Sequence, residues 1–195
     1  MTMQNMKLEQ PTLVHGGPGC GKTVFLLNLL DDLIAQEKEV WFCDTKGHEI
    51  LCETKENRRK HYLDKQKSEA LVHRLFDEID ERLARLDRGE EVAPVYVLID
   101  ELLEILGDVT VKNHLMSLLM IAPRVKVHII AAMMSPTWLH STMLQLFRQK
   151  IVFKTTPPNS LLLLGDDSAT SLKIGEYIVV REYEKIVRHR KGEQK

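Results

Sequence analysis

The sequence is poor in cysteine and has no long apolar run, and these two absences exclude several classes of protein. Its 195 residues include three cysteines (Cys20, Cys43 and Cys52), an odd number with no C-x-x-C pair. A disulfide scaffold or a zinc site is therefore not expected, and a reducing cytoplasm fits best. No apolar stretch approaches membrane-spanning length, and residues 1–11 are polar, unlike a signal peptide. We therefore expect a cytoplasmic protein with no integral membrane segment.

An excess of charge of one sign is also missing, since the formal net charge is -1. Any contact with nucleic acid must then come from a local patch or from an oligomer. The eight histidines show no metal-ligand spacing. His15, His128 and His140 lie within or beside apolar runs, which favours structural roles. There is no internal repeat and no low-complexity linker, so we expect a single domain over 1–195 with its core at about 12–180.

A glycine-rich segment near the N-terminus dominates what the sequence does contain. It matches the phosphate-binding pattern G-x-x-x-x-G-K-[ST] and consists of Gly16, Gly17, Pro18, Gly19, Cys20, Gly21, Lys22 and Thr23. Its glycines allow the backbone to curl so that N–H groups point at phosphate oxygens. The apolar run 12–15 before it predicts a strand. Apolar residues at helical spacing over 23–36 (Val24, Leu27, Leu30 and Ile34) predict a helix, whose N-terminus favours an anion. The segment predicts a nucleotide site in which Lys22 reaches the β- and γ-phosphates and Thr23 binds Mg²⁺.

An acidic pair at the end of an apolar run predicts the second half of that site. Residues 94–99 form a continuous apolar stretch that ends in Asp100 and Glu101. This pattern is typical of a central parallel strand that delivers a carboxylate to the edge of a sheet. Downstream of a phosphate loop it predicts a Walker B element. Asp100 would hold Mg²⁺, and Glu101 would orient and deprotonate the water that attacks the γ-phosphate of ATP.

The remaining pattern predicts a three-layer α/β P-loop NTPase domain. Further strands are expected at 39–43, 125–132 and 151–154, and a β-hairpin at 176–180 and 185–188. Helices are expected at 68–88, within 102–121 (with Met116 and Met120 as core filler) and at 137–147, followed by a turn at 155–159. The central sheet should be mainly parallel, with Asp100 and Glu101 on the strand next to the phosphate-loop strand.

Two further segments leave alternatives open. Residues 53–67 form the most basic stretch and include Tyr62, so they either contact a nucleic-acid backbone or form a solvated face, because Glu53, Glu56 and Asp64 are interspersed. Residues 44–47 (Asp-Thr-Lys-Gly) follow a predicted strand and are either a ligand-binding segment or a plain turn.

The order of these pieces resembles the FtsK–HerA superfamily of DNA-pumping ATPases. The resemblance rests on the phosphate loop, 44–47, 77–83, 97–101, 127–136 and 150–154, and it covers about residues 12–180. One departure concerns the strand at 127–132, which this family usually ends with Ala-Thr-Gln-Arg-Pro, the Gln sensing the γ-phosphate. Here Met134 replaces the Gln and Ser135 the Arg, and a thioether cannot donate a hydrogen bond to a phosphate.

The resemblance implies an ATPase that moves double-stranded DNA as a homo-oligomeric ring, pentameric or hexameric. The compact form looks like the packaging ATPases of membrane-containing icosahedral viruses, which implies a capsid or membrane vertex partner and a location in the host cytoplasm or virion. An arginine from the neighbouring subunit would complete the site, with Arg124 and Arg148 as candidates. The alternatives are a DNA-transfer ATPase of a plasmid or conjugative element and a non-motor ATP-binding switch or assembly ATPase. A small-molecule kinase is disfavoured, because Asp100 and Glu101 suit the activation of water.

Overall fold

A single mixed β-sheet runs through the computed structural model, which describes residues 8–44, 62–63, 68–106, 109–181 and 184–188. Within these residues the sheet has eight strands in the order β3-β2-β4-β5-β1-β6-β7-β8. In chain order they are β1 (Thr12–His15), β2 (Glu39–Cys43), β3 (Tyr62–Leu63), β4 (Val95–Ile99), β5 (Val127–Met133), β6 (Gln149–Phe153), β7 (Tyr177–Arg181) and β8 (Glu184–Arg188). The first six of these strands pair in parallel, and β7 and β8 add as an antiparallel C-terminal hairpin. The predicted fold class is confirmed.

The strand order corrects one expectation. The strand that ends in Asp100 and Glu101, β4, does not lie beside the phosphate-loop strand β1. Strand β5 pairs with both, with Thr12 opposite Ile130 on one side and Leu98 opposite Ile130 on the other. The acidic pair therefore reaches the phosphate loop across the C-terminal end of β5.

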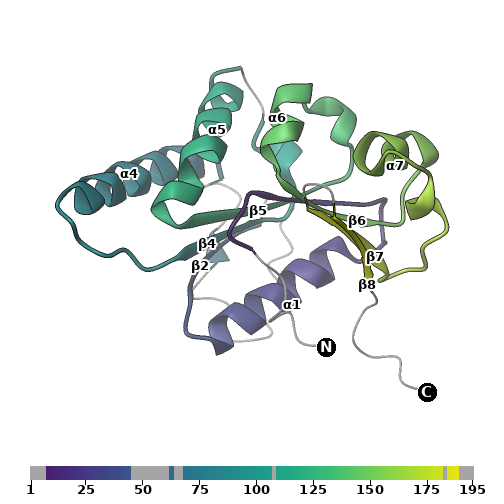
Figure 1. Cartoon of the computed structure of the whole chain (residues 1–195), viewed down its shortest axis with the longest axis horizontal. Helices are drawn as coiled ribbons and strands as arrows, with labels where there is room; N and C mark the ends of the chain where they lie inside the picture. The colour runs from purple at the N-terminus through teal and green to yellow at the C-terminus, as the bar shows by residue number, and fades with distance from the viewer. Residues whose placement is uncertain (1–7, 45–61, 64–67, 107–108, 182–183, 189–195) are drawn as a thin grey trace.

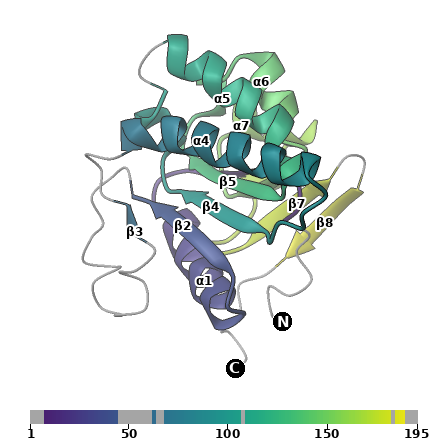
Figure 2. The ribbon, with the colours of Figure 1, turned by 90° about the vertical axis from the view of Figure 1, so that its left-hand side faces the viewer.

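Helices cover both faces of the sheet (Figures 1 and 2). Helix α1 (Lys22–Ala35) lies on one face, and α4 (Ser68–Asp87), α5 (Val109–Ile121), α6 (Ser141–Leu146) and α7 (Pro157–Leu164) lie on the other. Short 3-10 turns connect them: η3 (Leu102–Glu104), η4 (Ala122–Val125), η5 (Pro136–Trp138) and η6 (Ser168–Thr170). The hydrophobic core is accordingly divided into two clusters, one on each face of the sheet.

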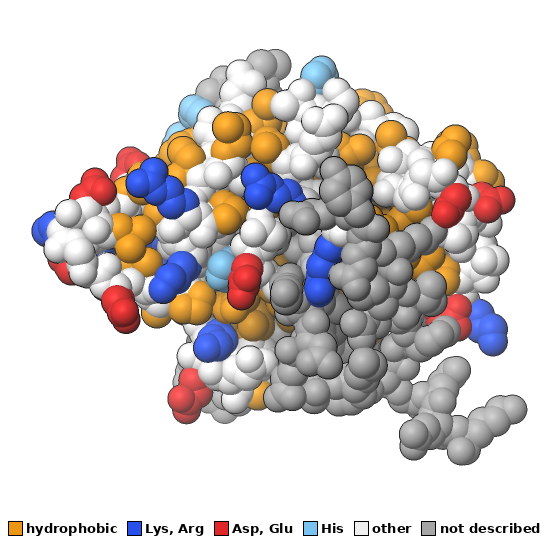
Figure 3. Space-filling view, in the orientation of Figure 1, with side chains coloured by type: hydrophobic (Ala, Val, Ile, Leu, Met, Phe, Trp, Pro, Cys, Tyr) orange, Lys and Arg blue, Asp and Glu red, His pale blue; other side chains and the backbone are white. Residues whose placement is uncertain are grey.

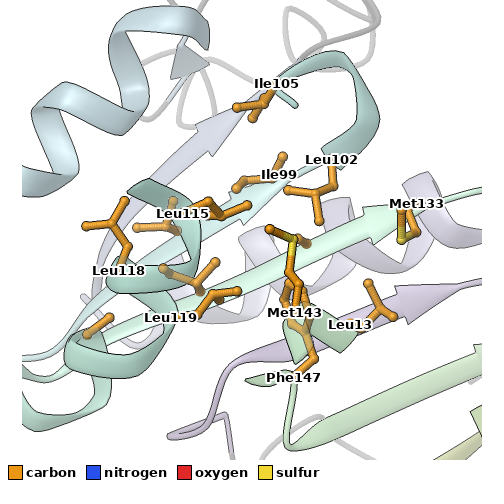
Figure 4. Packing of buried hydrophobic residues seen from close by; sticks show 14 of the residues in the cluster. Leu13, Ile99, Leu102, Ile105, Leu115, Leu118, Leu119, Met133, Met143 and Phe147 are labelled. Carbon is orange, nitrogen blue, oxygen red and sulfur yellow. The ribbon is translucent and has the colours of Figure 1, made fainter. Parts of the chain in front are cut away.

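The larger cluster joins α4, α5 and α6 to the strands. In Figure 4, Leu115, Leu118 and Leu119 of α5 point toward the sheet, and Met143 and Phe147 approach Leu13. All of these side chains are buried. Burying large aliphatic and aromatic side chains contributes about 1.5–3 kcal/mol each, so this packing fixes the sheet edge that carries the site.

Several predicted boundaries differ from the structure. The helix expected at 137–147 is split into η5 and α6, and the turn expected at 155–159 contains the start of α7, because Pro157 and Pro158 suit the first turn of a helix. Met120, expected in the core, is 67% exposed on α5. Val24, expected in the apolar stripe of the first helix, is 39% exposed. Leu27 and Leu30 of the same stripe are buried as expected, together with Phe25, Leu26, Leu29 and Leu33.

Two of the histidines that were expected to be structural lie outside the site. His128 is buried beside Tyr96, with ring centroids 5.0 Å apart, and burial lowers the pKa of its imidazole. The side chain of His140 accepts a hydrogen bond from the backbone N–H of Thr142 at the start of α6. Neither is placed to take part in chemistry at the phosphate loop.

Candidate active site

The phosphate loop connects the end of β1 to the start of α1, and three glycines determine its path. Gly19 and Gly21 have φ values of +69° and +109°, which side chains rarely allow. At Gly16 a Cβ atom would lie 2.5 Å from Cys20 Sγ and 2.6 Å from Phe153 Cβ, so only glycine fits there. Gly17 N donates to Lys154 O at 2.9 Å, which anchors the loop to the end of β6.

Lys22 is the first residue of α1, and its side chain folds back into the loop. The ammonium group donates hydrogen bonds to Gly16 O at 2.7 Å and Gly17 O at 2.9 Å, and only 5% of the residue is exposed. Its positive charge therefore lies in the hollow of the loop, beside the N-terminal N–H groups of a 14-residue helix. A helix N-terminus and a lysine at one point favour binding of a polyanion such as a triphosphate.

A hydrogen bond links the phosphate loop to the acidic pair. Thr23 Oγ1 donates to Asp100 Oδ1 at 2.9 Å, although the two residues are 77 positions apart. Asp100 is fully buried, and its backbone N–H donates to Cys43 O at 3.1 Å, which ties the end of β4 to the end of β2. A threonine hydroxyl and a carboxylate are the hard oxygen ligands that Mg²⁺ prefers, so this pair fits the ion.

Asp44 adds a second buried carboxylate next to β2. Burial, reinforced by the charges of Asp44 and Asp100, raises the pKa of the Cys43 thiol to about 12. Cys43 is therefore protonated at neutral pH and unsuited to act as a nucleophile. Of the segment 44–47 only Asp44 belongs to the described residues, so the choice between a ligand segment and a plain turn stays open.

Glu101 lies where the ends of β4 and β5 meet. Its side chain is 2% exposed, and Oε1 accepts a hydrogen bond from the backbone N–H of Met134 at 3.3 Å. The position after β5 that would carry the sensing Gln thus contributes its backbone N–H to Glu101. A buried carboxylate held at the rim of a phosphate site is suitably placed to accept a proton from water.

His15 connects three strand ends around the loop, a role that the sequence did not reveal. Its ring bonds Met133 O through Nδ1 at 3.2 Å and Thr155 Oγ1 through Nε2 at 2.8 Å. A carbonyl can only accept, so Nδ1 carries the proton and Nε2 accepts from Thr155. Burial lowers the pKa of His15 to about 4; the hydrogen bond to the Met133 carbonyl opposes part of this shift, and the nearby charge of Lys22 adds a smaller lowering. Its neutral ring holds β1, β5 and the end of β6 together.

The structure does not bring Arg124 or Arg148 to this site within one chain. Arg124 lies in η4, just before β5, and Arg148 immediately precedes β6, so both are at the opposite edge of the sheet. Both are exposed, and the proposed contribution of either to a neighbouring subunit stays a prediction. The basic stretch 53–67 lies outside the described residues except for the backbone of β3.

A strand, a phosphate loop, a helix and a second strand ending in buried acids define a P-loop nucleotide-binding ATPase. The sequence pattern of the family described as "ATPase family associated with various cellular activities (AAA)" matches residues 12–155. The chain belongs to this family. No curated protein matches the chain in sequence. Among the described residues, every helix is too short or too polar to cross a membrane.

Solved structures share this fold at low sequence identity. The conjugation coupling protein TcpA of pCW3, in a monomer form with ATPγS, aligns with a TM-score of 0.77 and 18% identity over 93% of this chain. EssC (ATPases 2 and 3) from Geobacillus thermodenitrificans aligns with a TM-score of 0.73 and 14% identity over 96% of this chain. The chain spans 60% and 41% of those two chains. The genome packaging NTPase B204 from Sulfolobus turreted icosahedral virus 2, in complex with AMPPCP, aligns with a TM-score of 0.69 and 13% identity. The alignment covers 95% of this chain and 99% of the B204 chain.

Proposed function

We propose that this chain hydrolyses ATP at the site between the phosphate loop and the acidic pair. The hydrogen bond between Thr23 and Asp100 carries this proposal, because it joins the two halves that the sequence predicted separately. Lys22 and the loop N–H groups would hold the β- and γ-phosphates. Thr23 and Asp100 would hold Mg²⁺, which supplies positive charge next to the phosphates when bound. Glu101 would orient the attacking water and accept its proton.

We further propose that ATP hydrolysis drives the movement of double-stranded DNA, as when a viral genome is packaged into a capsid. The fold shared with a packaging NTPase over nearly its whole length supports this proposal. The face seen in Figure 3 carries basic and acidic side chains intermixed, so a single copy offers little uniform positive charge there. A homo-oligomeric ring would gather several copies of any basic patch, including 53–67, around one duplex.

A conjugative DNA-transfer ATPase is the second candidate, favoured by the higher TM-score to the coupling protein TcpA. The third is a non-motor switch that binds ATP and docks a protein. Under the packaging proposal, a capsid or vertex protein would be a further partner, in the host cytoplasm or the virion.

The ATPase rate measured with and without double-stranded DNA across a salt series separates a motor from a switch. We expect DNA to raise the rate at low salt and the stimulation to fade as salt rises, because phosphate contacts release counterions. The Glu101→Gln variant serves as the control for contaminating hydrolysis. A rate indifferent to DNA at every salt concentration would contradict the motor and favour the switch.

A further inference from the structure

A tight turn before β7 lies against the phosphate loop. Residues Lys173–Glu176 form it: Glu176 N donates to Lys173 O at 3.1 Å, and the Glu176 carboxylate accepts from Lys173 N at 2.9 Å. Gly175, with φ +86°, occupies the third position, as in a type II turn. Two hydrogen bonds across four residues fix the conformation, so Ile174 is presented in one direction.

The turn is attached directly to the loop. Gly175 N donates to Cys20 O at 3.1 Å, and a Cβ on Gly21 would lie 3.7 Å from Gly175 Cα. In Figure 1 the link from β1 to α1, helix α7 and the chain leading into β7 lie together at the right of the molecule. The turn therefore borders the half of the phosphate loop that leads into α1.

A cluster of aromatic rings beneath the loop holds this arrangement. Phe25 of α1 contacts Phe153 and Tyr177, with ring centroids 5.8 and 5.4 Å apart, and Phe153 contacts Tyr177 at 5.2 Å. Phe153 and Tyr177 are opposite each other in the β6–β7 pair. Because Phe25 adjoins Val24 and Tyr177 follows the turn, the cluster fixes the first turn of α1 relative to Ile174.

Two aliphatic side chains next to the phosphate loop are exposed to solvent and do not belong to the hydrophobic core. Ile174 is 73% exposed, and Val24, on the first turn of α1, is 39% exposed. Both belong to segments that touch Cys20, Gly21 or their neighbours, whereas the rest of the turn is polar or glycine. Exposed aliphatic side chains held rigidly beside an anion site are suited to the apolar part of a ligand whose anionic part occupies that site.

We propose that this turn is the nucleobase subsite, in which the flat face of the purine of a nucleoside triphosphate packs on Ile174 with Val24 at its edge. The proposal rests on the proposed function, since it requires the triphosphate in the phosphate loop. A contact with the flat face of the purine does not involve the hydrogen-bonding groups by which adenine and guanine differ. Ile174 therefore contributes equally to the binding of ATP and of GTP.

Affinities of the full chain for ATP, GTP and inorganic tripolyphosphate, measured by calorimetry with Mg²⁺, test the proposal. Replacing Ile174 by Ala should weaken the binding of ATP and of GTP by the same factor of about five, because most of the apolar contact area with the base is lost. Binding of tripolyphosphate, which has no base, should be unchanged. Ile174→Phe should retain or tighten nucleotide binding, since an aromatic ring stacks on a purine.

The matched control is Met120→Ala, which removes a comparably exposed apolar side chain (67% exposed) from α5 and should alter none of the three affinities. An unchanged affinity for ATP in Ile174→Ala, or an equal loss for tripolyphosphate, would overturn the base subsite. Failure of the parent chain to bind either ATP or tripolyphosphate would instead refute the proposed function. The two failures are therefore distinguishable.

Discussion

At the scale of single residues, the site depends on side chains whose partners are far away in the sequence. Lys22 bonds the loop that precedes it, Thr23 bonds Asp100, and Glu101 bonds the backbone of Met134. His15 reaches Met133 and Thr155, 118 and 140 positions away. Apart from the bonds of Lys22 to its own loop, each of these contacts joins segments that are distant in the sequence and meet at the C-terminal ends of the parallel strands.

Replacing Lys22 by Ala should abolish measurable ATP binding, weakening it by about a hundredfold or more, because the buried cation of the loop is lost. Fluorescence titration with an ATP analogue measures this. The Arg88→Ala variant removes a cation that is 60% exposed and pairs with Glu90, so it should bind as the parent does. Unchanged affinity in Lys22→Ala would reject the assigned site.

The neutral ring of His15 should make stability depend on pH. The pKa of His15 is about 4 in the folded chain, below its usual 6.5, so the unfolded chain binds more protons between these values. Stability is complete well above pH 6.5 and falls as pH drops toward 4, by about 1.5 kcal/mol between pH 6.5 and pH 5. Urea unfolding of the parent and of His15→Gln at several pH values measures the effect.

The Gln variant keeps a donor and an acceptor but does not titrate, so its stability should fall less over this range. His128 also has a pKa lowered by burial and contributes to the slope in both proteins, so only their difference reports on His15. Identical slopes for the parent and His15→Gln would contradict the role given to this ring.

At the scale of elements, the strand–loop–helix unit could be predicted from sequence almost to the residue. Continuous apolar runs mark β1 and β2, and the glycine pattern with Lys22 and Thr23 marks the loop. The start of α7 was missed because two prolines resemble a turn, although proline also suits the first turn of a helix. Val24 was placed in the core because its spacing fits a helical stripe, whereas it lies on the outward face of α1, one turn before the exposed Asn28.

Two neighbouring glycines of the loop, Gly16 and Gly17, should differ sharply in how well the fold tolerates their replacement by alanine. A Cβ on Gly16 would overlap Cys20 Sγ and Phe153 Cβ, whereas a Cβ on Gly17 would make an ordinary contact with Lys154 O at 3.6 Å. We expect Gly16→Ala to destabilise the fold by about 1–3 kcal/mol through overpacking, and Gly17→Ala by much less. Thermal unfolding of both variants decides this; equal stabilities would show that the loop is not packed as described.

At the scale of the whole molecule, the order of strands was the part that local sequence could not supply. Asp100 was expected on the strand next to β1, but β5 lies between them. Strand order depends on crossover connections and on which faces the helices bury, and neither leaves a local pattern. The sheet still brings the phosphate loop and the acidic pair to one edge, because all parallel strands deliver their C-terminal ends there.

Arginine sharing between subunits has a direct test in mixtures of variants. If Arg124 or Arg148 acts on a neighbouring site, its Ala variant should bind ATP normally and lose turnover. Adding Lys22→Ala subunits, which retain both arginines, should then restore part of the activity in mixed rings. Activity that stays at the level of the arginine variant alone would exclude that residue from the neighbouring site.

The central claim is that Glu101 activates water for ATP bound between the phosphate loop and Asp100. The most direct test is to measure ATP affinity and ATP turnover on the same preparation, once for the parent and once for the Glu101→Gln variant. We predict that the variant binds ATP within about threefold of the parent and loses at least about a hundredfold in turnover, since Gln keeps the shape but cannot take a proton. Hydrolysis by Glu101→Gln at the parent rate would contradict the claim.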